Sequence, residues 1–177
     1  MLIPLVLASV VETLVRLAEP WKSVYDDSKA LSIVVVFVHL ASLLVGGGLA
    51  LATDRATLRV AGGTPTDRER HLAELGLTHR PVVASLAVSL LSGALLFFAD
   101  VETFATSVVF WGKMAFVAVL LLNGLMMLRA ERALRHPDTG VVPAGDVVLW
   151  RRLRVSAVVS GVLWLVTLLA GTVLVNS

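Results

Sequence analysis

The 177-residue sequence contains no cysteine. Disulfide bonds, thiolate metal sites and a cysteine nucleophile are therefore excluded, and any bound metal must be held by histidine, carboxylate or methionine. The chain also lacks a Ser-His-Asp arrangement, a pair of carboxylates within an apolar run and an acidic metal cluster. The residues thus give no support to a hydrolase or a proton pump.

What the chain has in excess is apolar surface. Hydrophobic residues make up 57% of the sequence and the mean hydropathy is +0.87, whereas soluble domains are roughly 45–50% apolar. Four windows reach the roughly 20 apolar residues that a bilayer-spanning helix needs. They are residues 31–52, 81–99, 108–128 and 155–175. We predict one all-α domain, a transmembrane four-helix bundle whose second and third spans form an antiparallel hairpin.

The basic residues predict the orientation of these spans. Most of them lie in two polar connections, 53–80 and 129–154, and few lie elsewhere. Because cytoplasmic loops retain arginine and lysine, we predict that both connections are cytoplasmic and that the C-terminus lies outside. This topology explains a pI near 9.5 without a nucleic-acid partner. The arginines in question are Arg55, Arg59, Arg68, Arg70, Arg80, Arg129, Arg132, Arg135, Arg151, Arg152 and Arg154.

The first 19 residues are apolar but contain charges on one helical face. Ser9, Glu12, Arg16 and Glu19 recur at spacings of three and four, and Glu12 and Arg16 are placed to form an i,i+4 ion pair. This pattern predicts an N-terminal amphipathic interfacial helix over 1–19, with a fifth span as the alternative. We expect the chain to turn at residues 19–21.

The two polar connections contain helix signals. Thr66 and Glu69 have the spacing of a capping box, and Gly76 follows as a stop, which predicts a short separate helix. In the second connection, residues 136–140 predict a helix end and Asp146 predicts the N-cap of an extended last helix.

Two ionisable residues lie within apolar windows and are the candidate site. His39 is about 12 Å below the outer end of the first span, and Lys113 is about 7–8 Å below the outer end of the third. Ionisable groups in hydrocarbon are costly and often functional. His39 is either a neutral imidazole bonded to a neighbouring helix or a ligand for a cofactor or metal. Lys113 either extends to the headgroups or contacts a bound anion.

The other histidines are weaker candidates. His71, His79 and His136 lie in or beside polar connections, where solvated imidazoles are ordinary. A haem held by both His39 and His79 is excluded by a height difference of the order of 18 Å, since both imidazoles would have to reach one metal.

Small and polar residues within the spans predict how the helices pack. Gly46, Gly47 and Gly48 permit either close helix approach or room for a planar ring. Serines of the second and fourth windows predict close packing there too. Asn123 and Trp164 are expected to form interhelical hydrogen bonds.

The order of these features resembles a family. The segments Val36–Ala41 running into Gly46-Gly47, Gly93–Asp100, and Phe110–Met114 followed by Leu122–Gly124 look like an uncharacterised family of small bacterial membrane proteins. More distantly, the His of the first span and the Lys of the third are similar to the haem-binding protoporphyrinogen oxidases and the copper-resistance D membrane domains. The resemblance implies a bacterial inner membrane protein with His39 as a haem ligand and Lys113 as a functional lysine.

Two functions follow as hypotheses. The first is a haem-associated or redox-linked membrane protein that uses His39 and Lys113. The second is a cofactor-free accessory subunit that packs against other membrane subunits or another copy of itself. Transport of copper or a small solute would need more polar residues along a pore than the spans contain.

Overall fold

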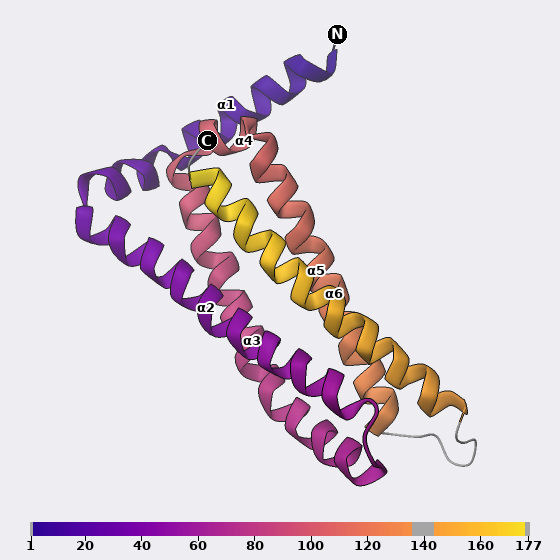
Figure 1. Ribbon diagram of the computed structural model, residues 1–177. Helices are drawn as coiled ribbons and strands as arrows, with labels where there is room; N and C mark the ends of the chain where they lie inside the picture. The colour runs from indigo at the N-terminus through magenta and orange to yellow at the C-terminus, as the bar shows by residue number, and fades with distance from the viewer. Residues whose placement is uncertain (1, 136–143, 176–177) are drawn as a thin grey trace.

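The computed structural model describes residues 2–135 and 144–175, and in these residues the chain forms six helices and no strand. The helices α2, α3, α5 and α6 run alongside one another as a four-helix bundle, while α1 and α4 lie at one end of it (Figure 1). The predicted all-α four-helix architecture is confirmed. The bounds are α1 Leu2–Asp27, α2 Lys29–Val60, α3 Pro65–Ala99, α4 Val101–Thr106, α5 Val108–Arg135 and α6 Ala144–Val175.

The four bundle helices are long and apolar enough to cross a bilayer. In the most apolar 18-residue window of each, only 11–22% of the residues are buried inside the bundle. The remaining apolar side chains point outward, and Leu44, Leu91 and Leu169 are 77%, 68% and 63% exposed. Lipid tails solvate such surface, whereas water does not. The chain is therefore a multi-pass integral membrane protein.

The spanning helices are packed unequally. α2 lies along α3, α5 lies along α6, and α2 also contacts α6. α3 and α5 follow one another in the chain, with α4 as the turn, but they meet mainly through side chains near their ends. At one end the Phe97 and Phe110 rings stack with centroids 5.3 Å apart, and at the other Arg135 donates to the Leu72 carbonyl. The predicted hairpin is correct in chain order, but each helix packs most closely on a different partner.

Helices continue into both polar connections, so the predicted loops 53–80 and 129–154 are mostly helical. α2 extends to Val60 and α3 begins at Pro65. The separate short helix predicted before Gly76 is wrong, since α3 runs unbroken through Gly76 and Pro81. A Cβ on Gly76 would lie 2.6 Å from Nη2 of Arg135. This glycine makes room for a guanidinium and does not end the helix.

Both predicted helices begin earlier in the chain than expected, α3 by two residues and α6 by three. α3 is capped by Thr64, whose hydroxyl oxygen accepts from the Asp67 amide at 3.3 Å while Asp67 accepts from the Thr64 amide at 3.1 Å. Pro65 then occupies the first helical position, which its fixed φ favours. α6 begins at Ala144, before the predicted cap Asp146. The helix end predicted at 136–140 lies outside the described residues.

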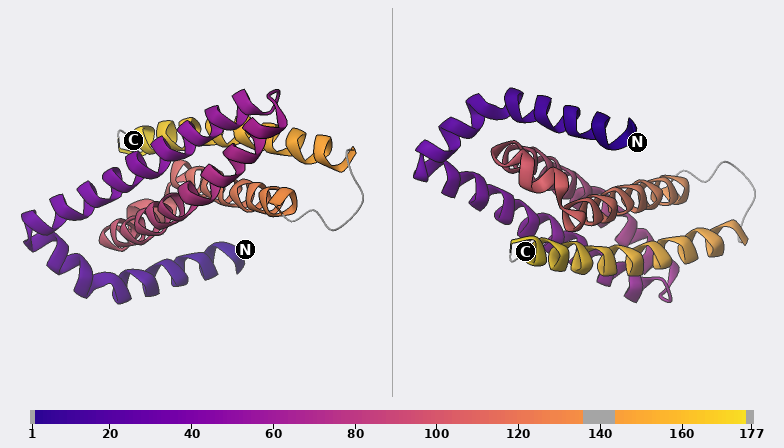
Figure 2. Two further views of the ribbon diagram at one scale, coloured as in Figure 1. Left: turned by 90° about the horizontal axis from the view of Figure 1, so that it is seen from below. Right: turned by 90° about the horizontal axis from the view of Figure 1, so that it is seen from above.

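α1 is longer than predicted and does not turn at 19–21. It continues through Pro20 to Asp27, and the break comes at Ser28, whose hydroxyl oxygen accepts from the Leu31 amide and caps α2. α1 is not among the described helices apolar enough to span a bilayer. It crosses the end of the bundle beside α4 (Figures 1 and 2).

Two contacts in α1 show how the helix is held. The predicted pair between Glu12 and Arg16 is present at 3.8 Å. The indole N–H of Trp21 donates to the Leu95 carbonyl of α3 at 2.9 Å, and Ala18 one turn earlier is buried. α1 is therefore tied to the last turns of α3.

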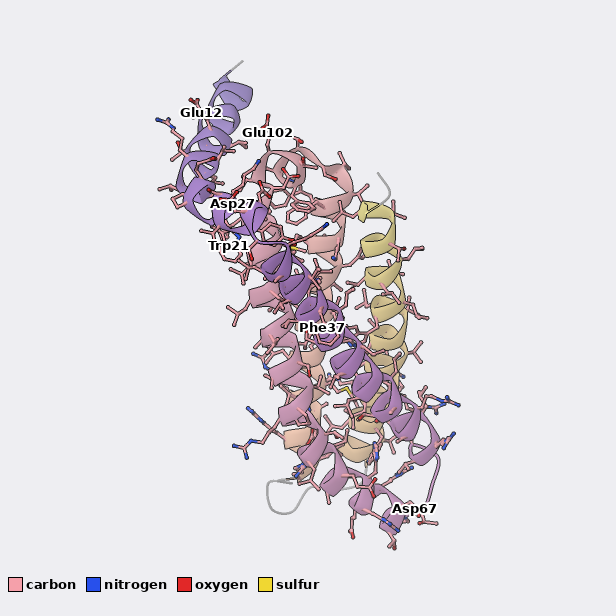
Figure 3. All side chains as sticks on the ribbon, turned by 90° about the vertical axis from the view of Figure 1, so that its left-hand side faces the viewer. Glu12, Trp21, Asp27, Phe37, Asp67 and Glu102 are labelled. Carbon is pink, nitrogen blue, oxygen red and sulfur yellow. The ribbon has the colours of Figure 1, made fainter. Side chains whose placement is uncertain are left out.

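Most charged residues lie at the two ends of the bundle, and most arginines lie at one of these ends. Asp27 and Glu102 lie at the end that carries α1 and α4, here called the outer end, and Asp67 lies at the opposite end (Figure 3). The arginine-bearing ends of α2, α3, α5 and α6 all meet at this opposite end, here called the basic end (Figure 1). A small core closes it, and it consists of Ala61, Leu75, Met127, Ala130, Trp150 and Leu153.

Single cysteines will test the orientation, because the chain has none of its own. Thr103 at the outer end and Thr64 at the basic end are both exposed. In intact cells, Thr103→Cys should react with a membrane-impermeant maleimide and Thr64→Cys should react only after the membrane is permeabilised. The opposite pattern would place the arginines outside, against the positive-inside rule.

Candidate functional site

His39 lies on the side of α2 that faces α3. Its Nδ1 is 3.0 Å from the Ser89 carbonyl oxygen and 3.1 Å from the Ser92 hydroxyl oxygen. A carbonyl can only accept, so Nδ1 carries the proton and donates it. The Ser92 hydroxyl donates its own hydrogen to the carbonyl oxygens of Val88 and Ser89. In the neutral ring, Nε2 is therefore left with a free lone pair.

Gly93 allows the imidazole to lie this close to α3. A Cβ at this position would be 3.1 Å from Cε1 of His39, tighter than ordinary van der Waals contact. Together with Ser89 and Ser92, this glycine forms the small-residue face that the sequence indicates for the second span. The face is the seam between α2 and α3, and it holds the ring in one orientation.

Lys113 lies on α5 and points towards α6. Its Nζ is 3.5 Å from the position that a Cβ on Gly171 would occupy, so the absence of a side chain there leaves space for the ammonium group. The side chain is partly buried. Among the described residues it has no hydrogen bond or ion pair, which is unusual for an amine within an apolar window.

The structure places His39 and Lys113 in the outer half of the bundle but on different helix pairs. No hydrogen bond joins the two side chains. No group of three or more His, Asp or Glu residues in the described part of the chain could hold a metal. A metal in this half would thus have His39 as its one histidine ligand.

The planar ring that lies on the glycine run is the indole of Trp164. Cε3 of this ring would be 3.1 Å from a Cβ on Gly47, and a Cβ on Gly46 would be 2.9 Å from Cβ of Ser85. Gly46 and Gly47 thus allow α2 to contact both α3 and α6 closely. A Cβ on Gly48, by contrast, would meet nothing within 4 Å. The hydrogen bond predicted for Trp164 is not formed with any described residue, and the ring packs against Gly47.

Asn123 behaves as predicted. Its Nδ2 donates to the Ser156 carbonyl of α6 at 2.9 Å, and the side chain is buried. The bond ties α5 to α6 below the candidate site.

The interpretation of His71 as a solvated residue is wrong. It is 3% exposed and its Nε2 lies 2.8 Å from the hydroxyl of Thr57, which is itself fully buried. The Thr57 hydroxyl donates to the Thr53 carbonyl, so Nε2 of His71 must donate to Thr57. The helical continuation of α2 and α3 beyond the apolar windows creates this contact, which the sequence does not reveal.

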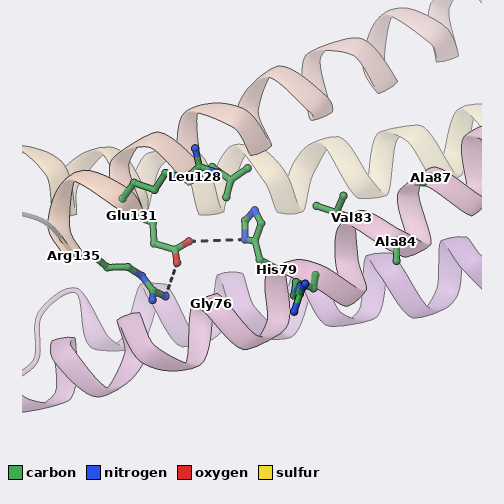
Figure 4. A pocket seen from close by; sticks show the side chains of 10 residues that line it. Gly76, His79, Val83, Ala84, Ala87, Leu128, Glu131 and Arg135 are labelled. Atoms are coloured by element: carbon green, nitrogen blue, oxygen red, sulfur yellow. Dashed lines mark hydrogen bonds and ion pairs between the residues drawn. The ribbon is translucent and has the colours of Figure 1, made fainter.

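The basic end holds a second polar group that the sequence analysis missed. Glu131 is buried, accepts a hydrogen bond from Arg135 at 2.6 Å, and approaches Nδ1 of His79 at 3.9 Å (Figure 4). The i,i+4 spacing of Glu131 and Arg135 was the available signal. Beside them an open cleft of about 640 Å³ separates α3 from α5. It is lined by Gly76, His79, Arg80, Val83, Ala84, Ala87, Leu128, Glu131, Arg132 and Arg135.

Comparison of the chain with protein-family models, curated proteins and solved structures finds no match. The family resemblance drawn from the residues therefore stays an expectation.

Proposed function

We propose that the outer half of the bundle binds a metal-centred redox cofactor, with haem b as the leading candidate, His39 as its protein ligand and Lys113 beside one of its carboxylates. The observation that carries this proposal is the hydrogen bond from Nδ1 of His39 to the Ser89 carbonyl. In metal-ligating histidines the N–H of the second ring nitrogen commonly donates to a carbonyl. This bond sets the tautomer and leaves the lone pair of the other nitrogen for the metal.

The donor set fits a single-histidine site. Nε2 of His39 is the ligand atom, Ser89 and Ser92 hold the ring, and Gly93 lets it lie against α3. Trp164 already covers Gly47, so a planar group must bind away from Gly46 and Gly47. When bound, the haem would supply one-electron chemistry.

Lys113 supports an anionic group on the ligand. A desolvated ammonium without a partner is costly, and a carboxylate would offset that cost. Gly171 leaves space for this amine against α6. By the same proposal the protein belongs to the bacterial inner membrane with its C-terminus outside, as the arginine distribution and the residue-level resemblance to haem-binding families indicate.

Absorption spectroscopy tests the proposal directly. The full chain purified in detergent should show a Soret band that shifts on reduction with dithionite. His39→Ala should abolish the band while the protein still elutes as a single species. Added imidazole should restore part of the band, because a free imidazole can occupy the vacated ligand position.

His79→Ala is the matched control, since it removes a histidine from the basic end and should leave the spectrum unchanged. A colourless wild-type protein would contradict the proposal. If that colourless protein co-purified stoichiometrically with other membrane subunits, the cofactor-free accessory role would replace it.

A further inference from the structure

The cleft between α3 and α5 at the basic end combines two chemistries. The part of the cleft nearest the basic end, here called its mouth, is lined by Arg80, Arg132 and Arg135. Further along the two helices the lining consists of small and aliphatic side chains. The cleft exists because α3 packs on α2 and α5 on α6, which leaves the two consecutive helices apart. Figure 4 shows the polar and apolar lining on facing sides of the two helices.

The arginines at the mouth are not all neutralised. Glu131 neutralises the charge of Arg135 through an ion pair in which Nη2 and Oε1 are 2.6 Å apart. Arg80 and Arg132 are exposed and, within the part of the chain that the structure describes, form no ion pair. Two positive charges therefore remain at the mouth, one on each helix.

The cleft lies at the depth of the lipid headgroups. Arg80 directly precedes the apolar window 81–99, and Arg132 follows the end of the window 108–128 by one turn. From Arg80 to Ala87 the cleft wall rises about 10 Å towards the middle of the bilayer at 1.5 Å per residue. This part is lined by Val83, Ala84, Ala87 and Leu128, a surface that suits an acyl chain.

We propose that this cleft binds one anionic phospholipid, with its phosphate between Arg80 and Arg132 and an acyl chain along Ala84 and Ala87. Basic pockets between membrane helices are suited to anionic headgroups. Because the cleft between α3 and α5 is open on one side, the lipid enters sideways from the bilayer. Because the side chains of Ala84 and Ala87 are small, a groove remains between the helices, and the acyl chain of the lipid fills it. The proposal is independent of the site at His39.

Native mass spectrometry of the full chain in detergent tests it by titration with single lipids. One dioleoyl-phosphatidylglycerol should bind at least about tenfold more tightly than dioleoyl-phosphatidylcholine. Each arginine near an anionic lipid contributes about 1 kcal/mol, so Arg80→Gln with Arg132→Gln should weaken the phosphatidylglycerol affinity roughly 30-fold. The control pair is Arg151→Gln with Arg154→Gln, which removes two exposed arginines of the same end that do not line the cleft. This pair should change the phosphatidylglycerol affinity less than about threefold.

A second variant tests the acyl groove without touching the charges. Ala84→Phe should weaken phosphatidylglycerol binding. In the unmodified protein, free glycerol 1-phosphate should compete poorly with the lipid. Equal binding of the two lipids, or an unchanged affinity in the Arg80/Arg132 variant, would overturn the proposal. Full competition by glycerol 1-phosphate would replace the lipid site with a simple anion site.

Discussion

Gly46→Leu should destabilise the bundle by at least about 3 kcal/mol, at the upper end of overpacking penalties. Even a Cβ at this position would lie 2.9 Å from Cβ of Ser85. That carbon is attached to the α3 backbone and has no rotamer by which to move away. α2 and α3 would have to separate, which would also break the contacts of His39 with α3. Unfolding in mixed detergent and SDS micelles, followed by circular dichroism, measures the loss.

Gly48→Leu is the matched control two residues along the same helix. A Cβ there meets nothing within 4 Å, and replacing glycine in a helix interior is favourable by up to about 1 kcal/mol. Its stability should be unchanged or higher. The milder Gly46→Ala should be destabilising alone and should recover when Ser85→Gly removes the opposing carbon. Equal effects of the Gly46 and Gly48 substitutions would mean that Gly46 does not form the α2–α3 seam.

Leu153→Ala should cost about 3 kcal/mol of unfolding free energy. The side chain is 0% exposed and packs in the core of the basic end with Leu75, Met127 and Trp150, which come from three helices. Removing it leaves a cavity that these helices can close only by shifting together, and leucine-to-alanine changes at such sites cost about 2–5 kcal/mol. The same unfolding measurement applies.

The control for this change is Leu169→Ala on the same helix. Leu169 is 63% exposed in an apolar window, where acyl chains refill the space of a deleted side chain. Its stability should fall by less than about 0.5 kcal/mol, the usual range for surface changes. A loss as large as that of Leu153→Ala would show that Leu169 faces another protein and not lipid.

Several features of this chain can be read from residues that are close in sequence. The four spans, the pair Glu12–Arg16 and the position of most arginines at one end depend on local composition and spacing, and the structure contains each of them. The bond from Asn123 to a neighbouring helix follows from the cost of leaving a buried amide unpaired. For His39 the sequence left two alternatives, a bond to a neighbouring helix or a ligand role, and the structure shows that the bond goes to α3.

Other features required the tertiary arrangement. Gly76 has the pattern of a helix stop, yet it lies beneath Arg135, 59 positions later in the chain. His71 is buried because α2 and α3 stay paired beyond their apolar windows. The ring that occupies the glycine face belongs to Trp164 of the last helix.

The sequence by itself determined that the protein resides in lipid and where its helices cross, because transfer free energy accumulates residue by residue over about 20 neighbours. Only the tertiary structure decided which faces meet: α2 on α3 and α5 on α6, with a cleft between α3 and α5. Hydropathy is nearly the same on every side of such helices, so the choice depends on shape matching between small residues and rings that lie far apart in the chain.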